Sequence, residues 1–225
     1  MARLAWKTES AYAGTYDQEL NDQDRAYSTA AIFSATSFLE ATVNELFNDA
    51  AEQPRSERFH GISQQLVMDL ARYVNNRTVW NQFKSTKNAA YRNTGTYGNE
   101  ILNKFQFACV SLGQPELIET TNSFIMTRLL IDTRNKITHY EPETVPVHDS
   151  EGPVTAQQIT QRLNGLFPAN PFSVAGNHNL FPALQLGHGI SEWAVLVAMQ
   201  FADDFFDHVN LKKAHEHVRP LTGTR

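Results

Sequence analysis

The longest uninterrupted helical pattern in the sequence covers residues 21–52. This stretch contains neither Gly nor Pro, and Pro54 follows it closely. Its apolar side chains, such as Tyr27, Leu46 and Phe47, recur at intervals that place them on one side of a helix. Since Pro stops a helix that has run this far, the pattern predicts a single long helix ending before Pro54. A helix of this length favours a fold of long helices packed together.

Helical spacing continues through most of the remaining chain. In residues 61–75 the apolar side chains stand at i, i+4, i+8 and i+11, which is one helical face. Pro115 suits the start of a helix and Pro142 disfavours its continuation, so a long helix is expected from residue 116 to about Tyr140. Further helices are expected at residues 79–92, 99–112, 155–166 and 190–211. No stretch alternates with period two for long enough to make a strand, so the sequence predicts an all-α, antiparallel helical bundle.

Length and composition fit one helical domain over residues 1–225. With 41% hydrophobic residues the chain can bury a core. We expect a core bundle over about residues 20–143 plus 190–211, with a loop-rich insertion at 144–189 that holds a short helix. Residues 212–225 are expected to be a loose tail. The net charge of −5 argues against a protein that coats polyanions over its whole surface, although a local basic surface stays compatible with it.

The chain has one cysteine, Cys109, within an apolar run. A lone cysteine forms no internal disulfide, so Cys109 is expected to be a small buried side chain. The N-terminal residues lack the apolar core of a signal peptide, and no run of about eighteen apolar residues offers a transmembrane helix. These features predict a soluble, cytoplasmic protein.

One helix end carries an unusual polar set. The segment TRNKITHYEPE, residues 133–143, holds Arg134, Asn135, His139 and Tyr140 within seven residues. On a helix Asn135 and His139 share a face, with Arg134 beside them. An imidazole exchanges protons near neutral pH, and a guanidinium matches phosphate oxygens. The set therefore suits phosphoryl transfer without a metal on RNA, whose 2′-OH is a built-in nucleophile. Alternatively, Arg and His simply complement the helix dipole at a structural end.

These residues also resemble a known family. Arg134–His139 reads RNKITH, the R-N-x-x-x-H form of the R-x(4–6)-H motif of HEPN domains, and residues 34–47, SATSFLEATVNELF, look like the first helix of many HEPN proteins. The resemblance covers about residues 21–143. It implies an all-α bundle and a metal-independent endoribonuclease with no cofactor, which cuts RNA to a 2′,3′-cyclic phosphate. It further implies a homodimer with a composite active site, and a toxin or phage-defence effector that an antitoxin or regulatory protein controls.

The resemblance assigns a role to each residue of the motif. His139 would transfer the proton, Arg134 would hold the scissile phosphate, and Asn135 would orient one or the other. Some HEPN toxins carry a modifiable Tyr two places after the His, but here Tyr140 comes one place after it and Glu141 holds that position. Other HEPN members bind without cutting. The alternative is therefore a non-catalytic helical module that binds RNA, a nucleotide or a partner protein, and a third interpretation is a purely structural bundle.

Two further polar residues lie on the first long helix. Glu40 and Asn44 are four residues apart and share a face. As buried polar groups they would need partners, and Arg134 is the partner we expect for them. The alternative is that both lie on the solvated face of the helix.

A second candidate surface is the stretch from residue 70 to residue 99, which contains no Asp or Glu. Basic groups neutralise phosphates and aromatic rings stack on unpaired bases, so the stretch is a candidate RNA-binding surface beside the site. The alternative is a solvated face whose aromatic residues belong to the core. The basic residues are Arg72, Arg77, Lys84, Lys87 and Arg92, and the aromatic residues are Tyr73, Trp80, Phe83, Tyr91 and Tyr97.

Overall fold

The long helix predicted from the sequence is the spine of the molecule. A computed structural model describes residues 1–11, 14, 16–93, 99–139, 155–175 and 181–213, with no side-chain detail at 91–93 and 175. Helix α2 (Gln18–Glu52) runs for 35 residues, and the Asp17 carboxylate caps it by accepting a hydrogen bond from the Leu20 N–H at 3.0 Å. The described ranges contain helices and no strand, so the all-α bundle is confirmed.

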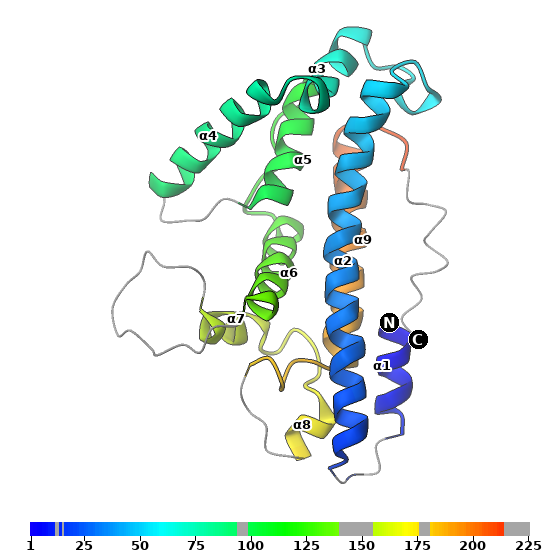
Figure 1. Cartoon of the computed structure of the whole chain (residues 1–225), viewed down its shortest axis with the longest axis vertical. Coiled ribbons are helices and arrows are strands. Elements are labelled where there is room, and N and C mark those ends of the chain that lie inside the picture. The colour runs from blue at the N-terminus through cyan, green and yellow to red at the C-terminus, as the bar shows by residue number, and fades with distance from the viewer. Residues whose placement is uncertain (12–13, 15, 94–98, 140–154, 176–180, 214–225) are drawn as a thin grey trace.

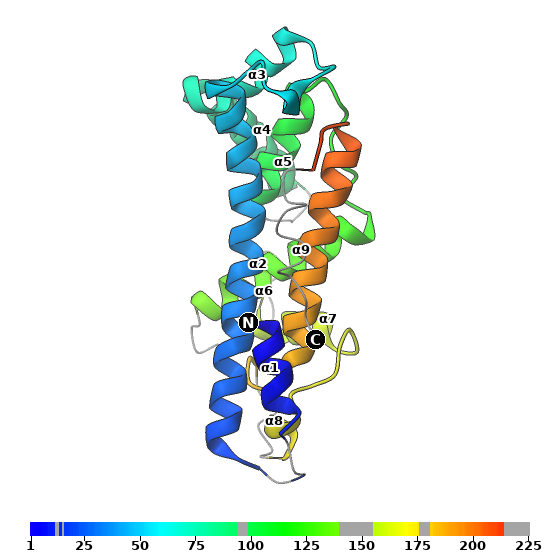
Figure 2. The same cartoon turned by 90° about the vertical axis from the view of Figure 1, so that its right-hand side faces the viewer.

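Two helices pack along α2. Helix α9 (His188–His208) lies beside it and runs in the same direction, whereas α1 (Ala2–Glu9) runs the opposite way against the lower half of both (Figures 1 and 2). Fully buried side chains such as Leu39 of α2 and Phe205 of α9 fill the space between them. Burying large apolar side chains contributes about 1.5–3 kcal/mol each, so this contact is a major source of stability.

The other side of the bundle consists of α5 (Glu100–Ser111) and α6 (Asn122–Thr138), which are placed one above the other in Figure 1. Helix α5 is buried on nearly every face, and its Phe105 ring makes edge contacts with Phe201 and Phe205 at 5.0 and 4.8 Å between centroids. The remaining elements are η1 (Glu57–Phe59), α3 (Gln64–Asn75), α4 (Arg77–Asn93), α7 (Ala156–Leu163) and α8 (Pro171–Ala175).

The helix expected from residue 116 starts later than predicted. Helix α6 begins at Asn122, where the Thr121 hydroxyl caps it through the Phe124 N–H at 3.3 Å. The preceding segment is held in a non-helical form by Gln106, whose side chain bonds both the N–H and the C=O of Leu117 at 2.6 and 2.9 Å. These bonds satisfy the backbone groups that a helix would otherwise pair, so Pro115 does not open a helix.

Some elements lie outside the predicted set. Helix α1 was not expected, and α8 lies in the segment expected to be a loop. The predicted insertion and tail are only partly described, because residues 140–154, 176–180 and 214–225 fall outside the ranges given above. In the part of the chain that is described, no helix has the length and apolar character needed to cross a membrane.

Candidate functional site

The polar set of the sequence lies on the last turn of α6. The helix ends at Thr138, close to the predicted end, and His139 is its C-cap residue with its N–H bonded to the Asn135 carbonyl at 2.9 Å. The side chains of Asn135 and His139 are both exposed. Tyr140 lies outside the described residues.

Arg134 lies on a different side of α6. Arg134 continues the face that α6 turns toward the bundle, because the residues three, four and seven positions before it are all buried. These residues are Ile131, Leu130 and Thr127. Its side chain is half-buried, and its Nε is buried without a hydrogen-bond partner. Within the described residues the guanidinium also forms no ion pair with a carboxylate.

Other partly buried cations in the structure have carboxylate partners. Lys104, whose side chain is 6% exposed, lies 2.9 Å from Glu40, and Arg128 lies 2.8 Å from Glu119. A desolvated cation without an opposite charge is costly, which is why buried charges are normally paired. Arg134 differs from these two cations in that no described carboxylate lies within ion-pair distance of its guanidinium.

Glu40 does not pair with Arg134, the partner expected from the sequence, because Lys104 takes that place. Helix α5 packs beside α2 at this level, and its Lys104 donates to the Glu40 carboxylate, which is 45% exposed. Asn44 lies one turn further along α2 and is half-buried. Arg134 and Glu40 thus belong to different polar groups.

The three motif side chains do not bond one another within one chain. The described contacts of this turn are the Thr138 hydroxyl donating to the Arg134 carbonyl at 2.8 Å and the backbone bond of His139 given above. With Arg134 facing the bundle and His139 facing solvent, a single copy of the chain presents the two groups on different sides of the helix end.

Sequence reasoning missed an acidic residue on the same helix. Asp132 stands seven residues before His139 and so shares its face, with Asn135 between them. Its Oδ2 lies 3.6 Å from Arg162 of α7. Burial raises the pKa of the Asp132 carboxyl, and the charges of Arg162 and Arg128 oppose this. The ion pair of Asp132 with Arg162 links α7 to α6. The sequence signal that could have identified Asp132 is its spacing of three and seven residues before Asn135 and His139.

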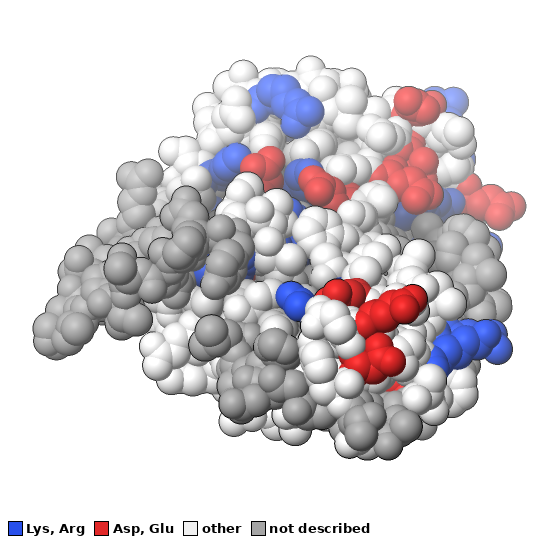
Figure 3. Space-filling model, turned by 60° about the horizontal axis from the view of Figure 1, so that its bottom comes forward, with Lys and Arg blue, Asp and Glu red and all other residues white. Residues whose placement is uncertain are grey.

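The basic residues of the second candidate surface are largely paired. Lys84 donates to Glu100 at 2.8 Å and thereby lowers the pKa of that carboxyl, while Lys87 contacts Glu116 and lies 3.7 Å from Glu119. The two arginines are Arg72, which lies 3.1 Å from Asp69, and Arg77, which covers the Tyr73 ring at 5.0 Å. The side chain of Arg92 is outside the described part. On the lower end of the molecule, which is turned forward in Figure 3, acidic side chains gather in one group with basic side chains beside it.

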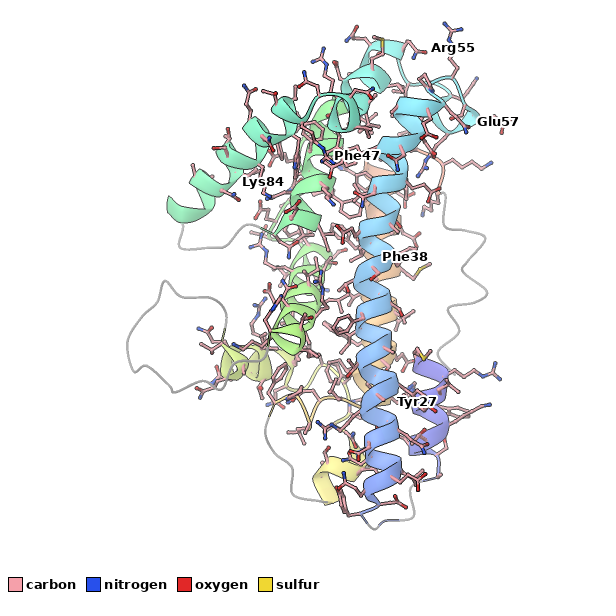
Figure 4. All side chains as sticks on the ribbon, in the orientation of Figure 1. Tyr27, Phe38, Phe47, Arg55, Glu57 and Lys84 are labelled. Carbon is pink, nitrogen blue, oxygen red and sulfur yellow. The ribbon has the colours of Figure 1, made fainter. Side chains whose placement is uncertain are left out.

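The aromatic residues of that stretch belong to the core where they are described. Phe47 of α2, labelled in Figure 4, stacks on Tyr73 at 4.0 Å between ring centroids. Trp80 and Phe83 pack on Phe107 of α5 at 5.7 and 5.3 Å. Tyr73 and Trp80 are 7% and 3% exposed. The expected stacking of bases on Tyr73 and Trp80 is wrong, because these buried rings hold α3 and α4 on the bundle, whereas Phe83 is only partly buried. Tyr97 and the side chain of Tyr91 are not described.

Compared with models of protein families, with curated proteins and with solved structures, the chain gives no match.

Proposed function

We propose that this protein is a metal-independent endoribonuclease of the HEPN type, and that Arg134, Asn135 and His139 form its catalytic set. The observation that best supports this proposal is Arg134, whose buried Nε has no hydrogen-bond partner among the described residues and which stands five residues before an exposed histidine at the end of the same helix. A half-buried guanidinium with free donors suits the oxygens of a phosphate group, which it can hold through two parallel hydrogen bonds.

The proposed reaction uses the RNA itself as nucleophile. The 2′-oxygen forms a bond to phosphorus, the bond from phosphorus to the 5′-oxygen breaks, and the product is a 2′,3′-cyclic phosphate. The 2′-hydroxyl loses a proton and the departing 5′-oxygen gains one. His139 suits the second transfer, because an imidazole can act as a general acid near neutral pH. Arg134 would stabilise the negative charge that grows on the non-bridging oxygens.

A second copy of the chain would complete the site. Arg134 and His139 lie on different sides of the helix end in one copy, so two copies meeting at this turn could place one residue from each against the same phosphate. This agrees with the homodimer that the resemblance implies. The proposed setting, a cytoplasmic toxin or phage-defence effector under the control of an antitoxin or regulatory protein, rests on the resemblance alone.

The experiment is cleavage of a single-stranded RNA in excess chelator by the wild type, His139→Ala and Arg134→Ala. Each substitution should lower the cleavage rate by about 100-fold or more, the usual contribution of one positioned acid–base or charge-stabilising group. The matched control is Arg25→Ala, since Arg25 is a half-exposed arginine on α2 with only a 4.0 Å contact to Asp22. Arg25→Ala should cut as the wild type does, and a substrate with 2′-deoxyribose at the cut site should stay intact.

The alternative function is binding of RNA without cleavage. The separation of Arg134 from the exposed His139 favours binding without cleavage if no second copy of the chain contacts the last turn of α6. In that case the wild type would retain RNA on a filter and leave it whole, Arg134→Ala would weaken retention, and His139→Ala would have little effect.

A further inference from the structure

A buried carboxyl group lies in the lower half of the bundle, where α1 rests on α2 and α9 (Figures 1 and 2). Asp24 of α2 is fully buried, and neither of its side-chain oxygens accepts a hydrogen bond from a described N–H or hydroxyl group. The nearby Ser28 hydroxyl donates to the Asp24 backbone carbonyl instead. A buried carboxyl group without a donor needs a physical explanation, because such groups are nearly always bonded.

The explanation is a second carboxyl group on α1. Glu9, the last residue of α1, interacts directly with the Asp24 side chain. Its Oε1 also accepts a hydrogen bond at 2.5 Å from the N–H of His188, the first residue of α9. Glu9 thus caps α9 from a distant part of the chain, in place of Gly187, which has no side chain to do so. A Cβ at Gly187 would lie 2.6 Å from the same Glu9 oxygen.

The charges around this pair do not neutralise two carboxylates. No described Lys or Arg forms an ion pair with Glu9 or Asp24. The titratable neighbours are on α9: His188, whose Nδ1 lies 3.3 Å from the Ala2 carbonyl, and Glu192, which lies 3.7 Å from His188 Nε2. Burial raises the pKa of Asp24 to about 8, helped by the charge of Glu9, and burial also raises the pKa of Glu9. A second negative charge beside a buried carboxylate is unfavourable, so such a pair favours holding one proton between its two groups.

The polar side chains on the α8 side are uncharged. Asn21, one turn before Asp24 on α2, accepts hydrogen bonds from Asn170 at 3.4 Å and from Ser173 at 3.2 Å, all within buried surroundings. These groups already have partners, so they offer the carboxyl pair no compensating positive charge.

We propose that α1 is a proton-dependent latch, held on α2 and α9 by one proton that Glu9 and Asp24 share. When that proton leaves, two negative charges face each other in a desolvated site, and moving Glu9 into water relieves the repulsion. Release of α1 would also leave the first N–H groups of α9 without their cap. The proposal is independent of the ribonuclease function and uses no RNA in its test.

The direction of the pH effect follows from linkage. The latched state binds a proton that the open state releases, since an exposed Asp has its ordinary pKa near 3.8. Latching therefore weakens as the pH rises from about 4 toward about 8 and stays constant above that. Within this window the open-to-latched ratio should rise up to about tenfold per pH unit for one proton.

The test is hydrogen exchange of α1 backbone amides between pH 6 and pH 9, corrected for the intrinsic pH dependence of exchange. In the wild type the opening ratio of α1 should rise by at least about tenfold and then level off. Asp24→Asn removes the shared proton and should give a nearly constant ratio. The matched control is Asp22→Asn, because Asp22 is 57% exposed on the same helix, and it should behave as the wild type does.

Two results would overturn the latch: an opening ratio of the wild type that does not change with pH, or an Asp24→Asn variant that keeps the full pH dependence. If Asp24→Asn does not fold, Glu9→Gln provides the same test. Its amide oxygen still accepts from His188, and its N–H₂ group can donate to Asp24 without a titrating proton. Because burial still raises the pKa of Asp24 in this variant, Glu9→Gln should show a smaller rise of the opening ratio with pH than the wild type, and retention of the full wild-type slope would refute the proposal.

Discussion

Replacing Arg134 by Met should make the folded protein more stable. Arg134 is a half-buried cation with no carboxylate partner in the described chain, and its Nε is buried without a hydrogen bond. A buried donor left without a partner costs about 1–3 kcal/mol, and we take the lower end because part of the side chain reaches solvent. Met keeps most of the apolar stem and has a similar helix propensity. Loss of a cation near the C-terminus of α6 opposes the gain by about 0.3 kcal/mol, the low end for this effect because Arg134 stands four residues before the last helical residue.

The expected change in the free energy of unfolding for Arg134→Met is a gain of about 1 kcal/mol, which corresponds to roughly 2–4 °C in the unfolding temperature of a chain of this size. The assay is urea unfolding at pH 7 followed by far-ultraviolet circular dichroism. Arg128→Met is the matched control on the same helix. Arg128 pairs with Glu119 at 2.8 Å and covers the Phe124 ring at 5.3 Å, so its loss should cost about 1 kcal/mol.

The two variants should therefore change stability in opposite directions. If Arg134→Met instead lost about 2 kcal/mol or more, Arg134 would have a structural partner, and the case for an anion-binding residue would fail. Residues that bind a ligand often lower the stability of the free protein, because their polar groups lack partners until the ligand is bound.

Three other positions give direct tests of the fold. Gln106→Leu should cost about 2 kcal/mol in urea unfolding, because it leaves the N–H and C=O of Leu117 unpaired, and an unchanged midpoint would contradict this. Cys109 is buried with its thiol pKa raised to about 12, so at pH 8 a thiol reagent should label it in 6 M guanidinium and leave it unlabelled in the native protein. Gly187→Ala should lower the unfolding temperature, because its Cβ would lie 2.6 Å from Glu9 Oε1 and 3.1 Å from the Asn170 Cα, and an unchanged temperature would show that this contact gives way.

The sequence predicted the helices whose apolar stripes are long. Helix α2 was expected at residues 21–52 and spans Gln18–Glu52, and α9 was expected at 190–211 and spans His188–His208. Helix α1 escaped prediction because its buried side, which comprises Ala2, Ala5 and Thr8, is made of small residues that give little apolar periodicity. Its docking depends on Glu9 and on distant parts of α2 and α9, which local sequence does not reveal.

The start of α6 shows how tertiary hydrogen bonds override local preference. Residues 116–121 follow Pro115 in a pattern that suits a helix, yet Gln106 from the neighbouring helix takes the backbone groups of Leu117. Nothing in the local sequence identifies Gln106 as that partner. The spacing did predict the position of His139 at the end of α6, because Pro142 limits how far the helix can continue.

Partner choice was the least predictable feature of the site. Sequence spacing placed Glu40 and Asn44 on one face of α2, but which cation reaches Glu40 depends on the packing of α5, and it is Lys104. Likewise, Trp80 and Phe83 carry the aromatic character of a base-stacking surface, and only the position of Phe107 shows that they are core residues.

The most direct test of the central claim is the chemical end of the RNA fragments that the wild type produces in excess chelator. The proposed reaction predicts a 2′,3′-cyclic phosphate on one fragment and a 5′-hydroxyl on the other, visible by mass spectrometry, and no such fragments from a folded His139→Ala variant. Fragments that end in a 3′-hydroxyl and a 5′-phosphate, cleavage that stops with chelator, or undiminished cleavage by His139→Ala would contradict the assignment of Arg134 and His139 as the catalytic pair.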